Sequence, residues 1–386
     1  MAKRTLFHNA TVYAPAGPQE AGWVLVEGAR IAGMGRGAPP AETSAERVDV
    51  RGNVLAPGMI DIHVHGALGC DTMDATPQAL RTMARFYAEH GVTAFLATTM
   101  TNPFEPIMAA LRNIAVVRSE GTGGAALLGA HIEGPYIAAE RCGAQDPALV
   151  RRADPAECTR FFDTGVVKLI TLAPEFAENQ KLISYARAHG AMVAAGHTQA
   201  RYEEMADAVA LGITQVTHLF NGMEPMHHRR PGAVGAALAM DDLCCQLIAD
   251  NIHIHPAVLK LAVRAKGVER IILITDAMSG TGMSDGHYAL GGLSVTVSEG
   301  IARIDNGALA GSTLTMERAV RNIMEAAHLP LFEALPMATS IPARSMGLRT
   351  KGSLAVGMDA DLIILGDAVN VLLTMVAGEV IYRRDS

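Results

Sequence analysis

Two histidines near residue 60 have the spacing of metal ligands. His63 and His65 lie two residues apart in the apolar segment GMIDIHVHG, and alternate residues of a strand point to the same face. Two imidazoles on a buried face are costly to desolvate without a partner, and a divalent cation provides one. Two hydrogen-bonded core histidines would give the same pattern, so the pair predicts a metal site only together with other ligands.

Further residues that can bind a cation follow other apolar segments. Glu133 in HIEGPY, His197 in AAGHT and His218 in THLFN each stand at the end of such a segment. These donors suit Zn²⁺, and they also suit Fe²⁺, Mn²⁺ or Co²⁺. Alone, Glu133 could begin a helix or form a surface ion pair; beside the histidines we expect it to bind one metal or bridge two. Related barrels often bind metal through a carboxylated lysine on the fourth strand. Lys168 lies near the start of the fourth segment, so its side chain should point away from the rim where the other ligands lie.

A carboxylate closes the strongly apolar segment RIILITDAM. Asp276 there loses hydration, and that loss must be compensated by nearby positive charge or hydrogen bonds. We interpret Asp276 as the general base that accepts a proton from a metal-activated water. The alternative interpretation is an N-cap of the helix that follows.

Polar residues near these ligands are candidates for substrate contact. His253 lies in ADNIHIHP, and Asn221 and Gly222 follow His218 in the chain. Arg229 belongs to the basic cluster HHRR, and a guanidinium group suits phosphate through its fork of N–H donors. A solvated basic loop would have the same sequence. If the cluster instead belongs to the site, it indicates a small anionic substrate.

Eight short apolar segments must position these residues. They span 58–66, 91–100, 127–135, 166–175, 191–198, 213–221, 245–254 and 270–278. Each is nearly continuous in apolar residues, as a parallel strand buried on both faces should be, and helix-like segments lie between them. Eight β–α units in series predict an α/β fold, a (β/α)₈ TIM-like barrel with its active site at the C-terminal ends of the strands. A doubly wound sheet is the rival, but it usually has fewer strands.

Both ends of the chain contain β-like runs separated by turn residues. We therefore expect three parts. Residues 1–56 form the first part of a small antiparallel β-sandwich, residues 57–342 form the metal-dependent barrel, and residues 343–386 form the second part of the sandwich.

Composition argues against several classes of protein. The formal net charge is −7 and no basic block occurs, so nucleic acid is not an expected partner. No run of 18 apolar residues is present to span a membrane, and the first residues lack the apolar core of a signal peptide. The five cysteines are irregularly spaced, which favours reduced thiols in a cytoplasmic protein.

The motifs, taken in chain order, resemble one family. PGMIDIHVHG, HIEGPYI, AAGHT, THLFNGM, ADNIHIHP and ITDAM are similar to the N-acetylglucosamine-6-phosphate deacetylases of the amidohydrolase superfamily. AGSTLTMERAVRNIM and MATSIPARSMGL are similar too, so the resemblance covers nearly the whole chain. HxH alone is weakly specific, whereas HIEGP with THLFNGM and ITDAM is highly specific.

The resemblance implies a homodimeric barrel hydrolase with a split β-sandwich. It implies that Glu133, His197 and His218 hold the main metal and that Asp276 is the catalytic acid and base. Some members lack the two histidines of the HxH motif and keep one metal. His63 and His65 are present here, so one or two ions can bind. The substrate contacts expected on this basis are Gly134, Gln145, Asn221, Gly222, Arg229 and His253, with Arg229 serving the partner subunit's site.

Two positions depart from the family pattern. Gln145 stands where many members have His, and Gly222 stands where Ala is common. Gln can hydrogen-bond but carries no charge, so the first departure bears on the preference for sugar or phosphate.

The expected activity is hydrolysis of the acetamide of N-acetylglucosamine 6-phosphate to glucosamine 6-phosphate and acetate. Three alternatives stay open: the N-acetylgalactosamine 6-phosphate isomer, another N-acyl or cyclic amide, and a non-catalytic barrel that has kept its ligands.

Overall fold

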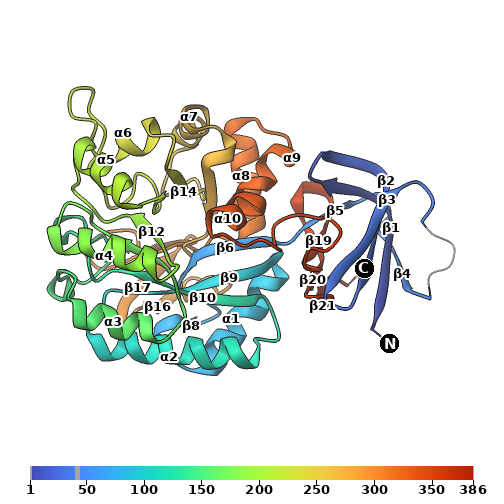
Figure 1. Ribbon diagram of the computed structural model, residues 1–386, viewed down its shortest axis with the longest axis horizontal. Helices are drawn as coiled ribbons and strands as arrows, with labels where there is room; N and C mark the ends of the chain where they lie inside the picture. The colour runs from blue at the N-terminus through green and yellow to red at the C-terminus, as the bar shows by residue number, and fades with distance from the viewer. Residues whose placement is uncertain (1, 40–43, 386) are drawn as a thin grey trace.

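The computed structural model describes residues 2–39 and 44–385. Its main body is a ring of eight parallel strands surrounded by helices (Figure 1). The strands are β6 (Met59–Val64), β9 (Val92–Thr99), β10 (Ala126–Glu133), β11 (Val167–Leu172), β12 (Met192–Ala195), β13 (Gln215–Val216), β14 (Cys244–Ile248) and β15 (Ile271–Ile274). The first and last strands, β6 and β15, lie in contact. The predicted barrel is therefore confirmed, with one strand in each expected segment.

The helices follow the strands and cover the barrel. They are α1 (Pro77–Glu89), α2 (Phe104–Glu120), α3 (Pro155–Asp163), α4 (Ala177–Ala188), α5 (Tyr202–Leu211), α6 (Gly232–Ala239), α7 (Pro256–Lys266), α8 (Met316–Ala327), α9 (Leu331–Ala334) and α10 (Ser340–Ser345). Local sequence explains their ends. Thr76 caps α1 by accepting a hydrogen bond from the Ala79 amide, and α5 ends at Gly212, which has a φ of 117° that favours glycine. None of the helices in residues 2–39 and 44–385 is long and apolar enough to cross a membrane.

The two ends of the chain build one further sheet beside the barrel (Figure 1). Its strands are β1 (Arg4–Ala14), β2 (Gly17–Glu27), β3 (Arg30–Arg36), β4 (Glu46–Asp49), β5 (Val54–Pro57), β19 (Leu362–Leu365), β20 (Val371–Val376) and β21 (Glu379–Arg383). Strand β5 joins the two halves, because it pairs with β1 on one side and with β19 on the other. Both halves contribute to one apolar cluster that includes Phe7, Val24, Leu362 and Leu373.

The expectation of a purely antiparallel terminal unit was wrong. Strand β1 pairs antiparallel with β2, but it pairs in parallel with β4 and with β5. An alternating apolar pattern indicates which face of a strand is buried and says nothing about the direction of its partner.

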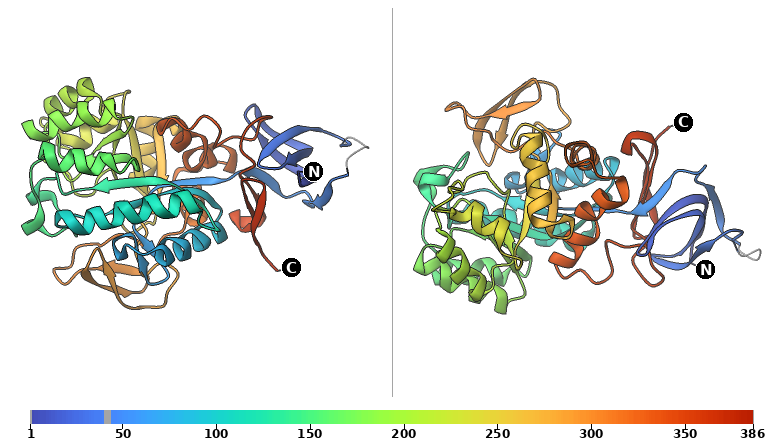
Figure 2. Two further views of the ribbon diagram at one scale, coloured as in Figure 1. Left: turned by 60° about the horizontal axis from the view of Figure 1, so that its bottom comes forward. Right: turned by 90° about the horizontal axis from the view of Figure 1, so that it is seen from above.

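A three-stranded antiparallel sheet projects from one side of the barrel (Figure 2). It comprises β16 (Gly286–Leu290), β17 (Leu293–Ser298) and β18 (Ile301–Arg303), between β15 and α8. The stretch 278–292 has the Gly-rich composition of a loop, yet its residues 286–290 form strand β16. Leu290, Val295 and Val297 of this sheet pack with Met100 and Met278 of the barrel. The sheet therefore forms part of the wall above the strand ends.

Candidate active site

The C-terminal ends of the barrel strands bring the predicted ligands together. His63 lies near the end of β6 and Glu133 is the last residue of β10. His197 and His218 each follow their strand, β12 and β13, by two residues. All four side chains are buried. Because parallel strands end at one rim, residues far apart in the sequence meet there.

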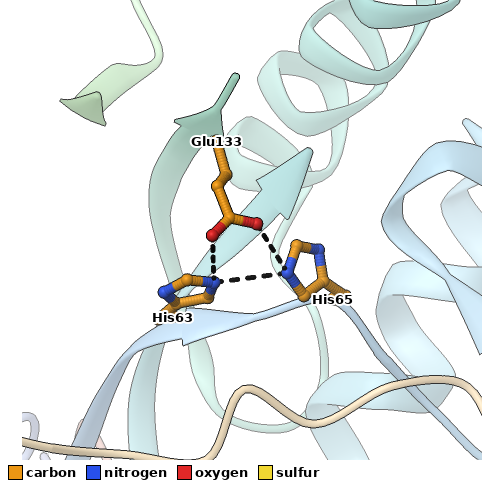
Figure 3. A group of neighbouring side chains, drawn as sticks. All are labelled: His63, His65 and Glu133. Atoms are coloured by element: carbon orange, nitrogen blue, oxygen red, sulfur yellow. Dashed lines mark hydrogen bonds and ion pairs between the residues drawn. The ribbon is translucent and has the colours of Figure 1, made fainter. Parts of the chain in front are cut away.

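The carboxylate of Glu133 lies at the centre of this group. Its Oε1 atom is 3.0 Å from His218 Nε2, 3.3 Å from His197 Nε2 and 3.4 Å from His63 Nε2. Its Oε2 atom is 3.2 Å from His65 Nε2, as Figure 3 shows. Burial raises the pKa of Glu133, but the facing imidazoles outweigh burial and hold that pKa well below its usual value.

Two overlapping groups could hold a metal ion, with Glu133 common to both. One is His63, His65 and Glu133, the other is Glu133, His197 and His218, and the ligand atoms of each lie within 4.8 Å of one another.

The surrounding hydrogen bonds fit a cation best at the second group. His197 Nδ1 is 2.8 Å from the Arg141 carbonyl oxygen and His218 Nδ1 is 3.1 Å from the Asn221 carbonyl oxygen. Each Nδ1–H can donate to its carbonyl, so each Nε2 is left with a lone pair that points at the centre.

In the first group, the histidines lack such hydrogen bonds to the surrounding residues that the structure describes. The Nδ1 atoms of His63 and His65 are buried without a hydrogen-bond partner among the described residues. Their Nε2 atoms are 3.2 Å apart, too close for both to carry a proton directed at the other. A cation between them would resolve this conflict, so the donor set also suits a second ion.

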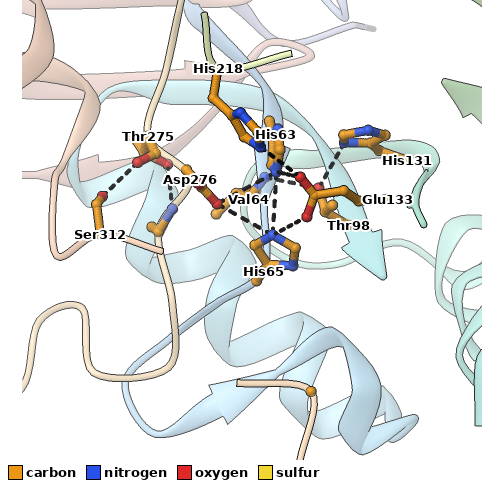
Figure 4. A network of polar contacts seen from close by, with 12 residues as sticks. His63, Val64, His65, Thr98, His131, Glu133, His218, Thr275, Asp276 and Ser312 are labelled. Atoms are coloured by element: carbon orange, nitrogen blue, oxygen red, sulfur yellow. Dashed lines mark hydrogen bonds and ion pairs between the residues drawn. The ribbon is translucent and has the colours of Figure 1, made fainter. Parts of the chain in front are cut away.

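Asp276 lies beside the histidine pair. Its Oδ1 atom is 3.4 Å from His63 Nε2 and 3.3 Å from His65 Nε2, and the group is drawn in Figure 4. Burial raises the pKa of Asp276, but the charges of His63 and His65 outweigh burial and lower that pKa overall. The carboxylate follows β15 by two residues and does not begin a helix, so the N-cap alternative is wrong.

These groups form the floor of a pocket of about 240 Å³. Its lining includes His65, Glu133, His197, His218 and Asp276. The pocket lies at the C-terminal ends of the strands, where barrel enzymes bind their substrates.

Comparison with known proteins decides the family. The sequence profile described as amidohydrolase family matches residues 54–381. The chain belongs to the amidohydrolase family.

Relatives of this amidohydrolase are similar over nearly their full length. An N-acetylglucosamine-6-phosphate deacetylase from Vibrio furnissii is 42% identical over 332 residues, which are 85% of this chain and 83% of that protein. An N-acetylgalactosamine-6-phosphate deacetylase from Escherichia coli O157:H7 is 37% identical over 364 residues, 93% of this chain and 96% of that protein.

A solved structure is similar as well. It is a mutant N-acetyl-D-glucosamine-6-phosphate deacetylase from Mycobacterium smegmatis, in complex with N-acetyl-D-glucosamine-6-phosphate. Its TM-score is 0.92 at 34% identity, with 98% of this chain and 99% of that chain covered. The resemblance inferred from the motifs is thereby confirmed.

The predicted substrate contacts of this amidohydrolase fall into two groups. Gln145, Asn221, Gly222 and His253 line the pocket. Gly134 does not line it; a Cβ atom at this residue would lie 2.1 Å from Thr101 Oγ1, so glycine permits a close approach there. Arg229 is exposed in the loop after His218 and is also absent from this pocket's lining.

Several residues of the site escaped prediction. Met100, Leu290, Ala308, Leu309 and Gly311 are among those that line the pocket wall, and most of these five come from the three-stranded sheet and the loop after it. No apolar period or ligand-type residue marks them. Asp250 was also missed: its Oδ2 atom is 2.6 Å from His253 Nδ1. Its position three residues before His253 was the available signal.

Proposed function

We propose that this amidohydrolase is a metal-dependent deacetylase that converts N-acetylglucosamine 6-phosphate to glucosamine 6-phosphate and acetate. The observation that carries the proposal is the convergence of Glu133, His197 and His218 with Asp276 on the floor of one pocket. The relatives named above support the choice of substrate.

Glu133, His197 and His218 would hold the main cation, and His63 and His65 would share a second ion with Glu133. Nitrogen and oxygen donors favour Zn²⁺, and Fe²⁺, Mn²⁺ or Co²⁺ suit the same set. A divalent cation bound there supplies Lewis acidity, which lowers the pKa of water towards about 7 and polarises the acetamide carbonyl.

Asp276 moves the proton in this proposal. Its Oδ1 atom accepts a proton from the attacking water as the new C–O bond to the acetyl carbon forms. Asp276 then donates that proton to the amide nitrogen as the C–N bond breaks. The products are acetate and the protonated amine, so the atoms of one water molecule are divided between them.

His253 orients the substrate. Its Nδ1–H donates to Asp250, whose carboxylate also accepts from the His253 main-chain amide at 2.8 Å. This pair holds the imidazole ring in one orientation and leaves Nε2 for the substrate. Asn221, Gly222 and Gln145 complete the polar wall that faces the sugar.

Arg229 would bind the phosphate from a neighbouring subunit. It is exposed, together with His227, His228 and Arg230, and it lies outside the pocket of its own subunit. A homodimer that brings this loop to the partner's pocket would supply a guanidinium group, because the pocket lining contains no arginine or lysine among the described residues. The five free cysteines support a reducing, cytoplasmic setting for the enzyme.

N-acetylgalactosamine 6-phosphate is the second candidate substrate. The Escherichia coli relative carries this activity in its name, and the two sugars differ only in the configuration of one hydroxyl group. Gln145 is neutral and can serve either configuration as a hydrogen-bond partner.

Acetate release tests the proposal. The purified protein is assayed on both N-acetyl amino-sugar 6-phosphates and on both unphosphorylated sugars, with metal content measured on the same sample. We expect the highest kcat/KM on N-acetylglucosamine 6-phosphate. A higher kcat/KM on the galacto isomer would select the second candidate. An equal kcat/KM on the phosphorylated and unphosphorylated sugars would show that the enzyme has no phosphate site.

Asp276→Asn tests the proton transfer. We expect kcat to fall by roughly 10²–10⁴-fold, the usual contribution of a positioned acid and base, while bound metal per chain is unchanged. Asp305→Asn, at an exposed carboxylate in the loop after β18, is the matched control and should keep wild-type kcat. Near-wild-type activity of Asp276→Asn would remove Asp276 from the mechanism.

A further inference from the structure

The main chain at Asp276 has an unusual conformation. Its φ is 50°, in the left-handed region that residues other than glycine rarely adopt. A residue in this conformation persists only where its surroundings hold it. The hydrogen bonds around residues 275 and 276 therefore decide where the Asp276 carboxylate points.

Ser312 donates hydrogen bonds to two consecutive carbonyl groups of this turn, those of Thr275 and Asp276. Its main-chain N–H donates to the Asp276 carbonyl oxygen at 2.7 Å, and its Oγ–H donates to the Thr275 carbonyl oxygen at 2.5 Å. Ser312 is 3% exposed, and it lies in the segment between β18 and α8, far from β15 in the sequence. Figure 4 shows Ser312 next to Thr275, on the side away from His218.

Strand β6 holds the same turn from the opposite side. The Asp276 N–H donates to the His63 carbonyl oxygen at 2.9 Å. The Thr275 hydroxyl donates to Asp61 Oδ2 at 2.5 Å. With the two bonds to Ser312, these contacts fix the amide and the carbonyl of Asp276 between two separate segments of the chain.

The residue before Ser312 is adapted to the same contact. Gly311 has a φ of 61°, and a Cβ atom there would lie 2.9 Å from the Asp276 carbonyl oxygen and 3.1 Å from Met278 Cβ. A side chain would push the segment away from the turn. Gly311 therefore lets Ser312 approach closely enough to form both bonds.

We propose that Ser312 is a positioning residue for Asp276. It fixes the left-handed turn so that the carboxylate stays beside His63 and His65, facing the substrate pocket. This inference rests on the proposed function, in which Asp276 transfers the proton. It assigns to Ser312, which does not line the pocket, a role in the reaction without contact to the substrate.

Ser312→Ala removes the bond to the Thr275 carbonyl and leaves the main-chain bond to Asp276. We expect kcat to fall about 10- to 100-fold, because a displacement of the order of 1 Å at a reacting group has an effect of this size. KM and metal content should change less than about twofold.

Thr313→Ala is the matched control. It removes a neighbouring hydroxyl that also donates to a main-chain carbonyl, that of Gly300, at 2.6 Å. It should keep wild-type kcat. Ser312 Oγ also accepts from the Leu314 amide at 3.0 Å, so the thermal midpoint of both variants is measured to record any general loosening.

The decisive comparison adds Ser312→Ala to Asp276→Asn. If Ser312 acts through the carboxylate, the second substitution changes the residual kcat less than about twofold, because residues that act as a unit are not additive. An equal fold-loss with and without the Asp276 carboxylate would overturn the inference. A wild-type enzyme without turnover on any acetylated amino sugar would instead remove the proposed function, and this inference with it.

Thr281→Val provides a milder variant in case Ser312→Ala does not fold. The Thr281 hydroxyl donates to the Ser312 carbonyl oxygen at 3.0 Å, so Val loosens Ser312 without touching Asp276. We expect a smaller fall in kcat that is again absent in the Asp276→Asn background. An unchanged kcat in Thr281→Val together with an unfolded Ser312→Ala would assign Ser312 to folding alone.

Discussion

The two carboxylate oxygens of Glu133 face different partners. Oε1 faces His63, His197 and His218, whereas Oε2 faces His65 and accepts a hydrogen bond from Gln145 Nε2 at 2.9 Å. The other end of the Gln145 amide is also engaged, because its Oε1 accepts from the Thr101 N–H at 2.7 Å. Gln145 therefore has one N–H left for a substrate, and it orients the carboxylate that both metal groups share.

Gln145→Leu keeps the side-chain size and removes both hydrogen bonds. We expect affinity for the divalent metal to fall by roughly 10–100-fold, as is typical when a partner of a ligand is lost. Competition with a chelator, followed by metal analysis, measures this. Gln199→Leu, which removes an amide that donates to Glu140 on the surface, is the control. A raised KM with unchanged metal affinity would show that Gln145 serves the sugar instead.

Much of the site could be predicted from the sequence at this scale, and the reason is geometric. His63, Glu133, His197 and Asp276 each follow an apolar run, and such runs end at one rim of a parallel barrel. The contacts of Gln145 could not be predicted in the same way. They depend on the conformation of loops, and sequence spacing does not determine which hydrogen bonds a loop side chain makes.

At the scale of elements, two helices distant in sequence are joined by a partly buried contact. His90, which follows α1, has its Nδ1 atom 2.9 Å from Glu317 Oε1 in the first turn of α8. The Thr315 hydroxyl donates to the same oxygen at 2.8 Å. Burial raises the pKa of Glu317, but the hydrogen bonds and charge of these partners outweigh burial and lower it. The ionised carboxylate is thus stabilised in the folded state.

Glu317→Gln should lower the free energy of unfolding by about 1.5–3 kcal/mol at pH 7, the usual range for a hydrogen bond to a charged group. Because the folded pKa is depressed, this stabilisation is present above the unfolded pKa of about 4.3 and is lost as pH falls through the lower folded pKa. Urea unfolding between pH 7 and pH 3 measures the difference, which should shrink at the acid end.

The exposed Glu105→Gln is the control, because the ion pairs of Glu105 with described residues are long, at 3.9 and 4.0 Å. A Glu317→Gln effect that stayed constant over the whole pH range would show that the charge is not its cause.

Elements were predicted best where burial is complete on both faces. The eight barrel strands were found because their apolar runs are continuous. Strand β16 was missed because its Gly-rich surroundings resemble a loop, and its burial comes from packing on the barrel and not from a regular pattern of its own. The parallel pairing of β1 with β5 was missed because the direction of a partner strand is decided by the path of the chain between them.

At the scale of the whole molecule, the terminal sheet and the barrel share apolar side chains. Ile363, Leu365 and Val371 of the terminal sheet belong to the main cluster of the barrel, and β5 is followed by β6 after a single residue, Gly58. We propose that residues 1–56 and 343–386 form one part of the protein and residues 57–342 the other. Because the two parts share this core, we expect them to unfold as a single cooperative unit.

The only tryptophan makes this testable. Trp23 lies in β2, where its indole covers Gly33 and Gly35 of β3, so its fluorescence reports on the terminal sheet. Far-ultraviolet circular dichroism reports mainly on the α-helices, and helices α1 to α10 lie outside that sheet. Because the two parts share core side chains, we expect both signals to change at the same urea concentration, as a two-state transition requires. Separate midpoints would show that the terminal sheet unfolds on its own.

Lys351→Met extends this test, because it acts within the part formed by the two ends of the chain. Lys351 Nζ is 2.5 Å from Asp361 Oδ2 and 3.1 Å from Asp359 Oδ2. Removal of the ammonium leaves the buried Asp361 carboxylate without its cation, and we expect a loss of about 1–3 kcal/mol. If the molecule is one cooperative unit, the fluorescence and dichroism midpoints fall together by the same amount. A fall in the Trp23 midpoint alone would show that the shared core does not couple the two parts.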